Sequence, residues 1–432
     1  MSSSNRRGTR RMSRVCLLAL TPVLAASSLA ACGKSTSSGG GGGGTTKTTG
    51  PSAAATNDAK FFPGKKATGT PINIALMVDA GGTAVNQPET GQAAVAAVKY
   101  ANDNLGGIAG HPINIALNCQ TKEDPATARD CANQAVAAKV DAVVVTSTAQ
   151  GDQMAPVITK AGIPYISASG AAASELTSAN AYMLTAGFPG VLLGWAAYSK
   201  QNGYKAITVF PTGSPTVVAG VNAFGGPAFK AAGITLNTVP IPTGTPDATP
   251  QVSAGLKGNP GAIGIVGDQT ECTAVLKALS TVGAASKAKR LVIQPCTDPT
   301  VVKAVGSALD GSLVWNTYET TGTNDEVQLY LAIMKKYAPS TETGGYAGVG
   351  YQGMLGFIRA ANSGGLTGAV TPAAVSAAIK AAQNVPLPLG DGITFTCDGK
   401  ALAPLVAICS KSVITQDYKN GGLSNPQVVQ TG

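Results

Sequence analysis

Histidine, the side chain used most often for proton transfer in catalysis, occurs only once in this 432-residue chain. His111 stands between Gly110 and Pro112 in a predicted turn. One imidazole cannot build a multi-histidine metal site, and no Gly-x-Ser-x-Gly elbow is accompanied by a second histidine to serve it. The sequence therefore predicts a protein that is not an enzyme, and it predicts neither a metal site nor a cofactor.

Cysteine is the second side chain whose chemistry the sequence brings into question. Cys32 lies in a short motif that the other cysteines lack. Leu29-Ala-Ala-Cys32-Gly resembles a bacterial lipobox, whose cysteine receives a diacylglyceryl group and palmitate. Five arginines precede it, followed by an apolar stretch from Val15 that is shorter than the ~20 residues of a transmembrane helix. We predict a lipoprotein signal peptide over residues 1–31 and lipidation of Cys32. The alternative is a plain cleavage site beside a chance cysteine.

Six further cysteines are expected to form disulfides, because an exported chain folds in an oxidising compartment. Many connectivities are open to six cysteines, and pairing between sequence neighbours is the simplest. The predicted pairs are Cys119 with Cys131, Cys272 with Cys296, and Cys397 with Cys409. Zinc binding is the rival interpretation, but no Cys-x-x-Cys spacing favours it.

The net charge of +9 could indicate binding to nucleic acid or to an acidic surface. Five arginines lie in the first 14 residues, and five lysines with a single acid lie between residues 33 and 68. The remainder of the chain is formally neutral, so no nucleic-acid partner is expected. Residues 32–68, which contain Cys32 and six consecutive glycines, are predicted to be a flexible tether.

From Pro71 onward, apolar β-rich runs alternate with stretches of helical periodicity. In the first half, strands are expected at 72–78, 113–117, 140–145 and 163–166, with helices at 89–102, 125–138 and 152–161. In the second half, strands are expected at 206–210, 234–239, 262–266, 290–293 and 313–316, with helices including 219–232 and 270–282. Helices at 327–337, 346–362 and 372–382 then precede short strands at 393–396 and 405–408.

This alternation predicts an α/β fold of two doubly wound parallel-sheet lobes joined by a hinge. The first lobe is expected to comprise 69–188 with 318–385, and the second 189–317 with 386–432. A ligand is expected in the crevice between the lobes, at the carboxyl ends of the strands. The Gly-x-Gly-x-x-Gly run beginning at Gly348 lies inside a predicted helix, so it does not indicate a dinucleotide site.

The turn Asn102-Asp-Asn-Leu-Gly-Gly-Ile-Ala-Gly-His-Pro-Ile113 resembles that of the leucine/isoleucine/valine-binding family, the substrate-binding proteins of branched-chain amino-acid ABC transporters. The match continues through Asp124-Pro125, 143–147, 161–167 and 175–177, and extends to 350–351 and Ala360. It covers about residues 70 to 420 and is strongest in the first lobe. The resemblance implies a type I periplasmic-binding fold.

In that family, hydroxyls and backbone N–H groups after the third and fourth strands hold the carboxylate of an amino acid, at helix N-termini that favour anions. The corresponding residues here are Ser147, Thr148, Ser169, Gly170 and Ala171. The family commonly has threonine where Ala172 stands, and Ser169, an apparent insertion, is the candidate to replace the missing hydroxyl. The alternative role of these serines is helix N-capping.

On the second lobe, the family places an acid shortly after a strand to receive the ligand ammonium. Glu271 is the first candidate for this role and Asp268 the second. The alternative is that a carboxylate in the first turn simply favours the helix dipole. Thr212 lies in the loop 211–214, where many members have an aromatic and an acidic residue, so a bulky aliphatic ligand is not indicated.

The resemblance implies a monomeric, lipid-anchored solute-binding protein on the extracytoplasmic face of the cell membrane. It would capture a small polar or zwitterionic ligand by closure of its lobes and deliver it to an ABC permease. The alternative is a receptor domain that senses the ligand and signals to a membrane partner without transport.

Overall fold

The computed structural model of the chain describes residues 58–83, 85–284 and 287–431, which belong to one compact unit, Ala55–Gly432. The predicted signal peptide, the predicted lipidation site at Cys32 and the tether up to residue 57 lie outside the described residues. Within these residues no helix has both the length and the apolar character needed to cross a bilayer. They also contain no cluster of three or more His, Cys, Asp or Glu side chains suited to a metal ion.

Residues 58–68, predicted as the end of the tether, pack on the first lobe instead. Helix α1 (Asp58–Phe61) is followed by Phe62, whose ring lies edge-on against Tyr100 with centroids 5.9 Å apart. The backbone N–H of Ala67 donates to the carbonyl of Asn102 at 2.8 Å. The aromatic pair at 61–62 supplies apolar surface that a Gly/Ser/Thr-rich tether lacks, so this part of the tether prediction was wrong.

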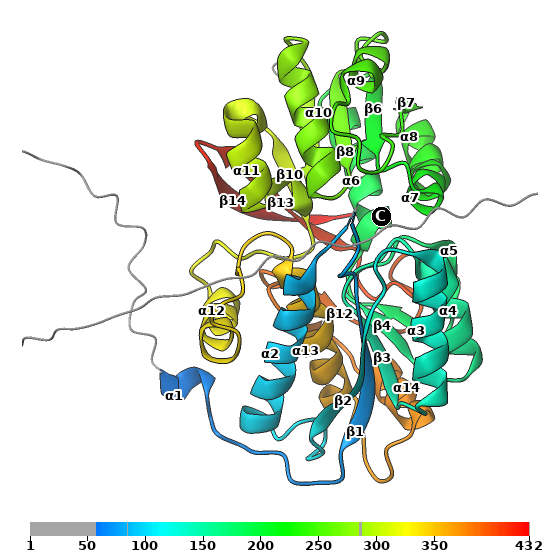
Figure 1. Ribbon diagram of the computed structural model, residues 1–432, viewed down its shortest axis with the longest axis vertical. Helices are drawn as coiled ribbons and strands as arrows, with labels where there is room; N and C mark the ends of the chain where they lie inside the picture. Colours follow the sequence, from blue (N-terminus) through cyan, green and yellow to red (C-terminus); the bar gives the residue numbers. More distant parts are fainter. Residues whose placement is uncertain (1–57, 84, 285–286, 432) are drawn as a thin grey trace, which may run out of the picture. The chain divides into compact units, whose positions relative to one another are not determined.

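The first lobe is built on a parallel sheet of five strands in the order β2-β1-β3-β4-β5. The strands are β1 (Ile72–Val78), β2 (Ile113–Gln120), β3 (Ala142–Val145), β4 (Tyr165–Ser167) and β5 (Ala181–Met183). One face is covered by α2 (Pro88–Asn104), α12 (Asp325–Tyr337), α13 (Ala347–Ser363) and α14 (Pro372–Ala381). The other is covered by α3 (Pro125–Ala137), α4 (Gly151–Lys160) and α5 (Ala173–Thr177). Figure 1 shows the sheet between these two layers.

The glycine motif at 348–353 lies inside α13, as predicted, and it allows close packing. A Cβ on Gly350 would stand 1.9 Å from the carbonyl oxygen of Thr90 in α2, and one on Gly348 would stand 2.6 Å from the ring of Tyr318. The absence of side chains at these positions therefore lets α13 approach α2 and the ring of Tyr318. The motif serves helix packing.

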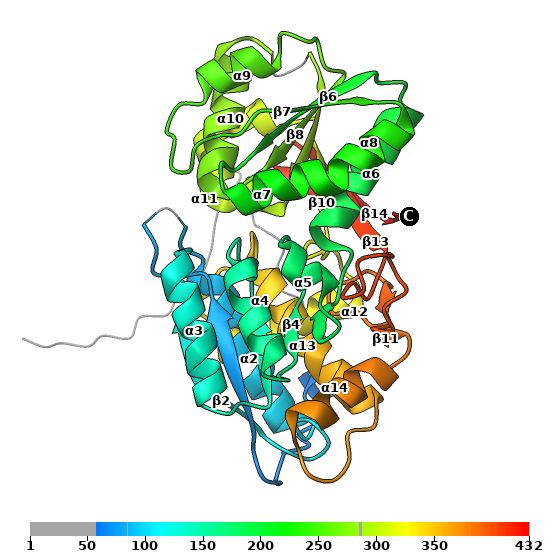
Figure 2. The same cartoon turned by 90° about the vertical axis from the view of Figure 1, so that its right-hand side faces the viewer.

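The second lobe contains a sheet of seven strands in the order β14-β13-β10-β9-β8-β6-β7. Its five parallel strands are β6 (Ala206–Pro211), β7 (Thr235–Thr238), β8 (Ala262–Val266), β9 (Lys289–Ile293) and β10 (Leu313–Asn316). Helices α6 (Gly187–Gln201), α7 (Pro215–Gly220) and α8 (Gly226–Ala232) cover one face, with a π-helical turn at Val221–Gly225 between the last two. Helices α9 (Thr249–Gly255), α10 (Gln269–Thr281) and α11 (Pro299–Val305) cover the other. Figure 2 shows both lobes from the side.

The α/β class with two parallel-sheet lobes is confirmed, but the end of the chain differs from the prediction. The expected strand at 405–408 is a turn with a single bridge from Ile408 to Met183. An unpredicted antiparallel hairpin, β13 (Ser412–Lys419) and β14 (Gly422–Gln430), extends the second sheet. The edge strand β14 is mostly exposed, and the inner strand β13 buries polar residues such as Thr415 and Gln416, so neither contains the apolar run expected of a central strand.

The segment between α14 and β13 belongs to the first core. Strands β11 (Val385–Pro386) and β12 (Thr394–Phe395) pair with each other, and Leu387, Phe395 and Cys409 are buried in the first-lobe cluster. The chain therefore crosses to the second sheet near residue 411, and not at 386 as expected from the sequence.

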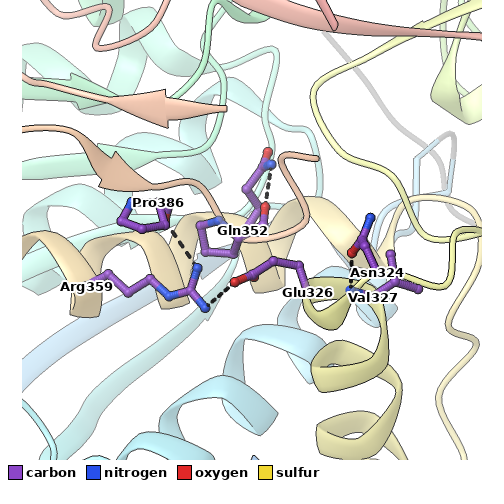
Figure 3. Close-up of polar contacts among 7 residues, drawn as sticks. Asn324, Glu326, Val327, Gln352, Arg359 and Pro386 are labelled. Atoms are coloured by element: carbon purple, nitrogen blue, oxygen red, sulfur yellow. Dashed lines mark hydrogen bonds and ion pairs between the residues drawn. The ribbon is translucent and has the colours of Figure 1, made fainter. Parts of the chain in front are cut away.

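Two side chains of α13 fasten this segment to the first lobe (Figure 3). Arg359 pairs with Glu326 of α12 at 2.9 Å and donates to the carbonyl of Pro386. Gln352, which is fully buried, donates to the carbonyls of Thr317 and Pro388 at 2.7 and 2.8 Å. The segments around Thr317 and Pro388, which Gln352 contacts, lie close to chain segments that connect the two lobes.

The three predicted disulfides are confirmed: Cys119–Cys131, Cys272–Cys296 and Cys397–Cys409. The first joins the end of β2 to α3, and the second joins the first turn of α10 to the turn after β9.

Candidate functional site

A cavity of about 560 Å³ lies between the carboxyl ends of the two parallel sheets. Loops that follow β1, β3 and β4 line it from the first lobe, and loops that follow β6 and β8 line it from the second. In each sheet these loops flank the point where the strand order reverses, because β1 lies beside β3 and β6 beside β8. Seven of the eight predicted site residues line the cavity: Ser147, Thr148, Ser169, Gly170, Ala171, Thr212 and Asp268. Glu271 does not.

The two hydroxyls after β3 have different partners. The hydroxyl of Ser147 bonds the phenol oxygen of Tyr346 at 3.3 Å, although the two residues are far apart in sequence. The hydroxyl of Thr148 accepts a bond from the backbone N–H of Gln150 at 2.8 Å, just before α4 begins at Gly151. Thr148 thus stabilises the turn before α4 locally, whereas the Ser147 hydroxyl bonds a residue of another segment and caps no helix.

In the loop after β4, two backbone N–H groups that could bind an anion already have an acceptor. The N–H groups of Ala171 and Ala172 both donate to one carboxylate oxygen of Glu175, at 3.1 and 2.9 Å. The other oxygen accepts from the hydroxyl of Tyr165 at 2.5 Å. Glu175 is only 1% exposed, and burial raises its pKa to about 7. Ser169 also lines the cavity.

A pair of carboxyl groups forms part of the first-lobe wall. Asp79 follows β1 directly and is 3% exposed, and Glu123 lies in the loop after β2. Burial and the neighbouring Glu123 carboxyl raise the pKa of Asp79 to about 9. One oxygen of Glu123 accepts from the N–H of Ala149 at 2.9 Å, and the other is buried without a hydrogen-bond partner in the described residues.

The second-lobe wall carries the two predicted acids in different environments. Asp268 lines the cavity and caps α10 by accepting from the N–H of Thr270 at 2.7 Å. Glu271, in the first turn of the same helix, is 0% exposed and lies behind Gly267. Neither of its carboxylate oxygens has a well-formed hydrogen bond in the described part of the chain. Burial, followed by the Asp268 carboxyl, raises its pKa to about 8.

Sequence reasoning missed several cavity residues that come from distant segments. They include Asp79, Glu123, Phe188, Trp315, Tyr318 and Tyr346. Asp79 could have been found, because it directly follows the first strand on the side where ligands bind. Tyr346 could not, since only the tertiary packing of α13 brings it to Ser147.

A family profile described as periplasmic binding protein matches residues 71–408. The fold is similar to that of a leucine-binding protein from Thermotoga maritima, at 18% identity over 83% of this chain and 99% of that chain, with a TM-score of 0.68. It is also similar to a branched-chain amino acid transporter substrate-binding protein from Streptococcus pneumoniae in complex with isoleucine (17% identity, 84% and 100% covered, TM-score 0.66). A search by sequence among curated proteins finds no match.

A third similar structure has a different kind of ligand. It is a solute-binding protein of an ABC transporter from Rhodopseudomonas palustris in complex with 3,4-dihydroxybenzoic acid (17% identity, 84% and 98% covered, TM-score 0.68). At these identities the similarity establishes the fold alone.

Proposed function

The chain belongs to the periplasmic binding protein family, and from that premise we propose that it captures a small polar or zwitterionic ligand, an amino acid or a related compound. The observation that carries this proposal is the cavity of about 560 Å³ lined from both lobes. A volume of this size suits a small molecule.

Closure of the lobes is the means of capture. A ligand in the cavity contacts residues after β3 and β4 on one side and after β6 and β8 on the other. Because both sets of contacts exist only when the lobes are together, the ligand shifts the equilibrium toward the closed state. We propose that the hinge consists of the three chain segments that connect the lobes, near residues 184–187, 317–319 and 409–412.

Ser147, Ser169 and Gly170 are the proposed first-lobe contacts to polar ligand atoms. Ser147 is the strongest of them, because its hydroxyl points to Tyr346 and does not cap a helix. Ala171 lines the cavity and is proposed to contact the ligand by its side chain, because its N–H already donates to Glu175. On the second lobe, Thr212 and Asp268 are the proposed contacts.

Delivery of the ligand to an ABC permease is the proposed biological role. The names of the similar structures support it, because they are substrate-binding proteins of such transporters. The lipobox-like sequence at Cys32 supports a lipid anchor on the extracytoplasmic face of the membrane. If Cys32→Ser left the protein equally membrane-bound, the anchor would be excluded.

A thermal-shift screen tests ligand capture. The panel comprises amino acids, amides, short peptides, amines and small carboxylates, each added to the purified protein. We expect at least one compound to raise the unfolding temperature, and Ser147→Ala to reduce that shift. Stabilisation by no compound of the panel, or turnover of any of them, would contradict the proposal.

A further inference from the structure

We propose that the ligand of this cavity has no carboxylate or other anionic group, and that it binds as a carboxamide or a comparable uncharged carbonyl compound. The inference rests on the proposed function and narrows it, because it removes free acids, amino acids included, from the class of ligands. Several backbone N–H groups around the cavity that could bind an anion are instead bonded to acids of the chain itself.

The donors just before α4 are bonded within the first lobe. The N–H of Ala149 donates to a carboxylate oxygen of Glu123 at 2.9 Å, and the N–H of Gln150 donates to the hydroxyl of Thr148 at 2.8 Å. A helix N-terminus attracts an anion through its free N–H groups and the positive end of its dipole. A ligand carboxylate at this helix would therefore have to displace Glu123 or lie beside it.

The loop after β4 is bonded to a second acid of the chain. Glu175 accepts the N–H groups of Ala171 and Ala172 at 3.1 and 2.9 Å, and the hydroxyl of Tyr165 at 2.5 Å. The carboxyl group also fills the space beside Gly151, the first residue of α4, where a Cβ would overlap it. Because Glu175 is buried and bonded on both oxygens, a ligand anion cannot take its place without breaking these three bonds.

The second-lobe wall shows the same arrangement at α10. Asp268, which lines the cavity, accepts the N–H groups of Thr270 and Glu271 at 2.7 and 3.3 Å. In the loop before α7, the N–H groups of Thr212 and Gly213 donate to backbone carbonyls at 2.8 and 2.6 Å. Three of the helices that begin beside the cavity, α4, α5 and α10, thus have an acid of the chain on N–H groups at or next to their first turn.

The side chains of the lining also favour a ligand without negative charge. The acids that line the cavity are Asp79, Glu123, Asp124 and Asp268. Among the lining residues that the structure describes, the only base is Lys122, which is exposed and lies beside Asp124. The acids outnumber this base even when Asp79 keeps its proton. Since like charges repel more strongly where water is excluded, an anionic ligand is disfavoured.

A carboxamide suits the polar groups that remain. The hydroxyls of Ser147 and Ser169 line the cavity and can donate to a carbonyl oxygen. The N–H groups of a carboxamide can donate in turn to an acid such as Asp268, and a carboxylate has no such donors. A carboxamide therefore satisfies the hydroxyls and the acids together, whereas a carboxylate satisfies the hydroxyls alone.

Calorimetric titration of the purified protein with matched acids and amides tests the proposal. The pairs are isoleucine with isoleucinamide and 3,4-dihydroxybenzoate with 3,4-dihydroxybenzamide, because the two acids are ligands of similar structures. A further pair comprises the best compound of the wider screen that has a carboxylate or carboxamide, with its counterpart. We expect the amide of each pair that binds to bind at least about tenfold more tightly than the acid.

The outcomes separate this inference from the proposed function. A free acid that binds as tightly as its amide, or that is the tightest ligand of the screen, would overturn the inference and leave the proposed function intact. Stabilisation by no compound of the wider screen would contradict both.

Two near-isosteric substitutions test the part played by the carboxyl groups. Asp268→Asn and Glu123→Gln each remove an acid and keep an acceptor oxygen for the N–H groups bonded there. Each should raise the affinity for the acid relative to its amide by about threefold or more, because less negative charge then repels the acid. Glu342→Gln, at an exposed position outside the cavity, should leave this ratio unchanged. A ratio that stays the same in both cavity variants would refute the exclusion of anions by these groups.

Discussion

At the scale of single residues, the carboxyl groups in and near the cavity differ in the partners that they have. Glu175 is the one with a complete set of donors, because Tyr165 and two backbone N–H groups satisfy both of its oxygens. Asp79 and Glu271 instead face other acids. The first arrangement fixes the shape of a loop, and the second favours the protonated form of Asp79 and of Glu271.

Replacing Glu175 by glutamine should loosen the loop after β4. Above its raised pKa of about 7, the carboxylate accepts all three bonds, whereas an amide offers one acceptor oxygen and brings donors that need partners. At about pH 8, Glu175→Gln should lower the free energy of unfolding by about 1–3 kcal/mol in urea denaturation. The exposed Glu342→Gln should change it by less than about 0.5 kcal/mol. Equal stabilities of the two variants would show that the carboxylate does not anchor this loop.

The raised pKa of Asp79 makes the ligand-free protein less stable at high pH. The native state keeps a proton that the unfolded state loses near the ordinary value of 3.8, and it releases that proton only near 9. The free energy of unfolding should therefore fall as the pH rises through this window, by at most about 1.4 kcal/mol per pH unit for one proton. Asp79→Asn should flatten this fall in denaturation measured from about pH 5 to about pH 9. An unchanged slope would mean that Asp79 is already ionised at neutral pH.

At the scale of elements, the sequence predicts strands and helices well where their periodicity is strong. Nine of the ten parallel strands, and helices such as α10 and α12, appear within a few residues of their predicted bounds, whereas the short strand β5 (Ala181–Met183) was not predicted. The hairpin of β13 and β14 was missed, because the buried strand β13 contains several polar residues and the exposed edge strand β14 has no apolar run. For the site, the sequence identified the loops after β3, β4, β6 and β8 but missed Asp79 after β1. It also missed contacts made by tertiary packing, such as that of Tyr346 with Ser147.

Helix packing in the first lobe depends on glycine at one position of α13. In Gly350→Ala, the new methyl group would stand 1.9 Å from the carbonyl oxygen of Thr90, so α2 and α13 must move apart. We expect a loss of about 1–3 kcal/mol in the free energy of unfolding, measured with urea. Gly226→Ala at the start of α8 meets nothing within 4 Å and should be neutral or stabilising by up to about 1 kcal/mol. If both variants had the same stability, tight packing at Gly350 would be excluded.

At the scale of the whole molecule, the lobes already touch beside the cavity. Gln87 of the first lobe donates to Gln269 of the second at 3.5 Å, and Gln294 of the second donates to the carbonyl of Gly345 of the first at 3.3 Å. These hydrogen bonds join residues that lie outside the three segments that connect the lobes. Separation of the lobes would therefore break them. Both hydrogen bonds are long, and a ligand between the two walls would add further contacts.

Closure should be visible in solution scattering. The radius of gyration of the protein should fall when a stabilising ligand from the screen is added, because the ligand shifts the population toward the closed state. Thr212→Trp, which places a large ring in the cavity wall, should abolish this change. A radius that stays constant at saturating ligand would contradict capture by lobe closure.

The central claim is that one small molecule binds in the cavity between the lobes, and calorimetric stoichiometry tests it most directly. Titration of the stabilising ligand into the native protein should give one site per chain. Thr212→Trp should lose this binding, and Thr281→Trp, which places the same ring at an exposed position at the end of α10, should retain it. Undiminished binding to the Thr212→Trp variant would contradict the account, because the ligand would then lie elsewhere.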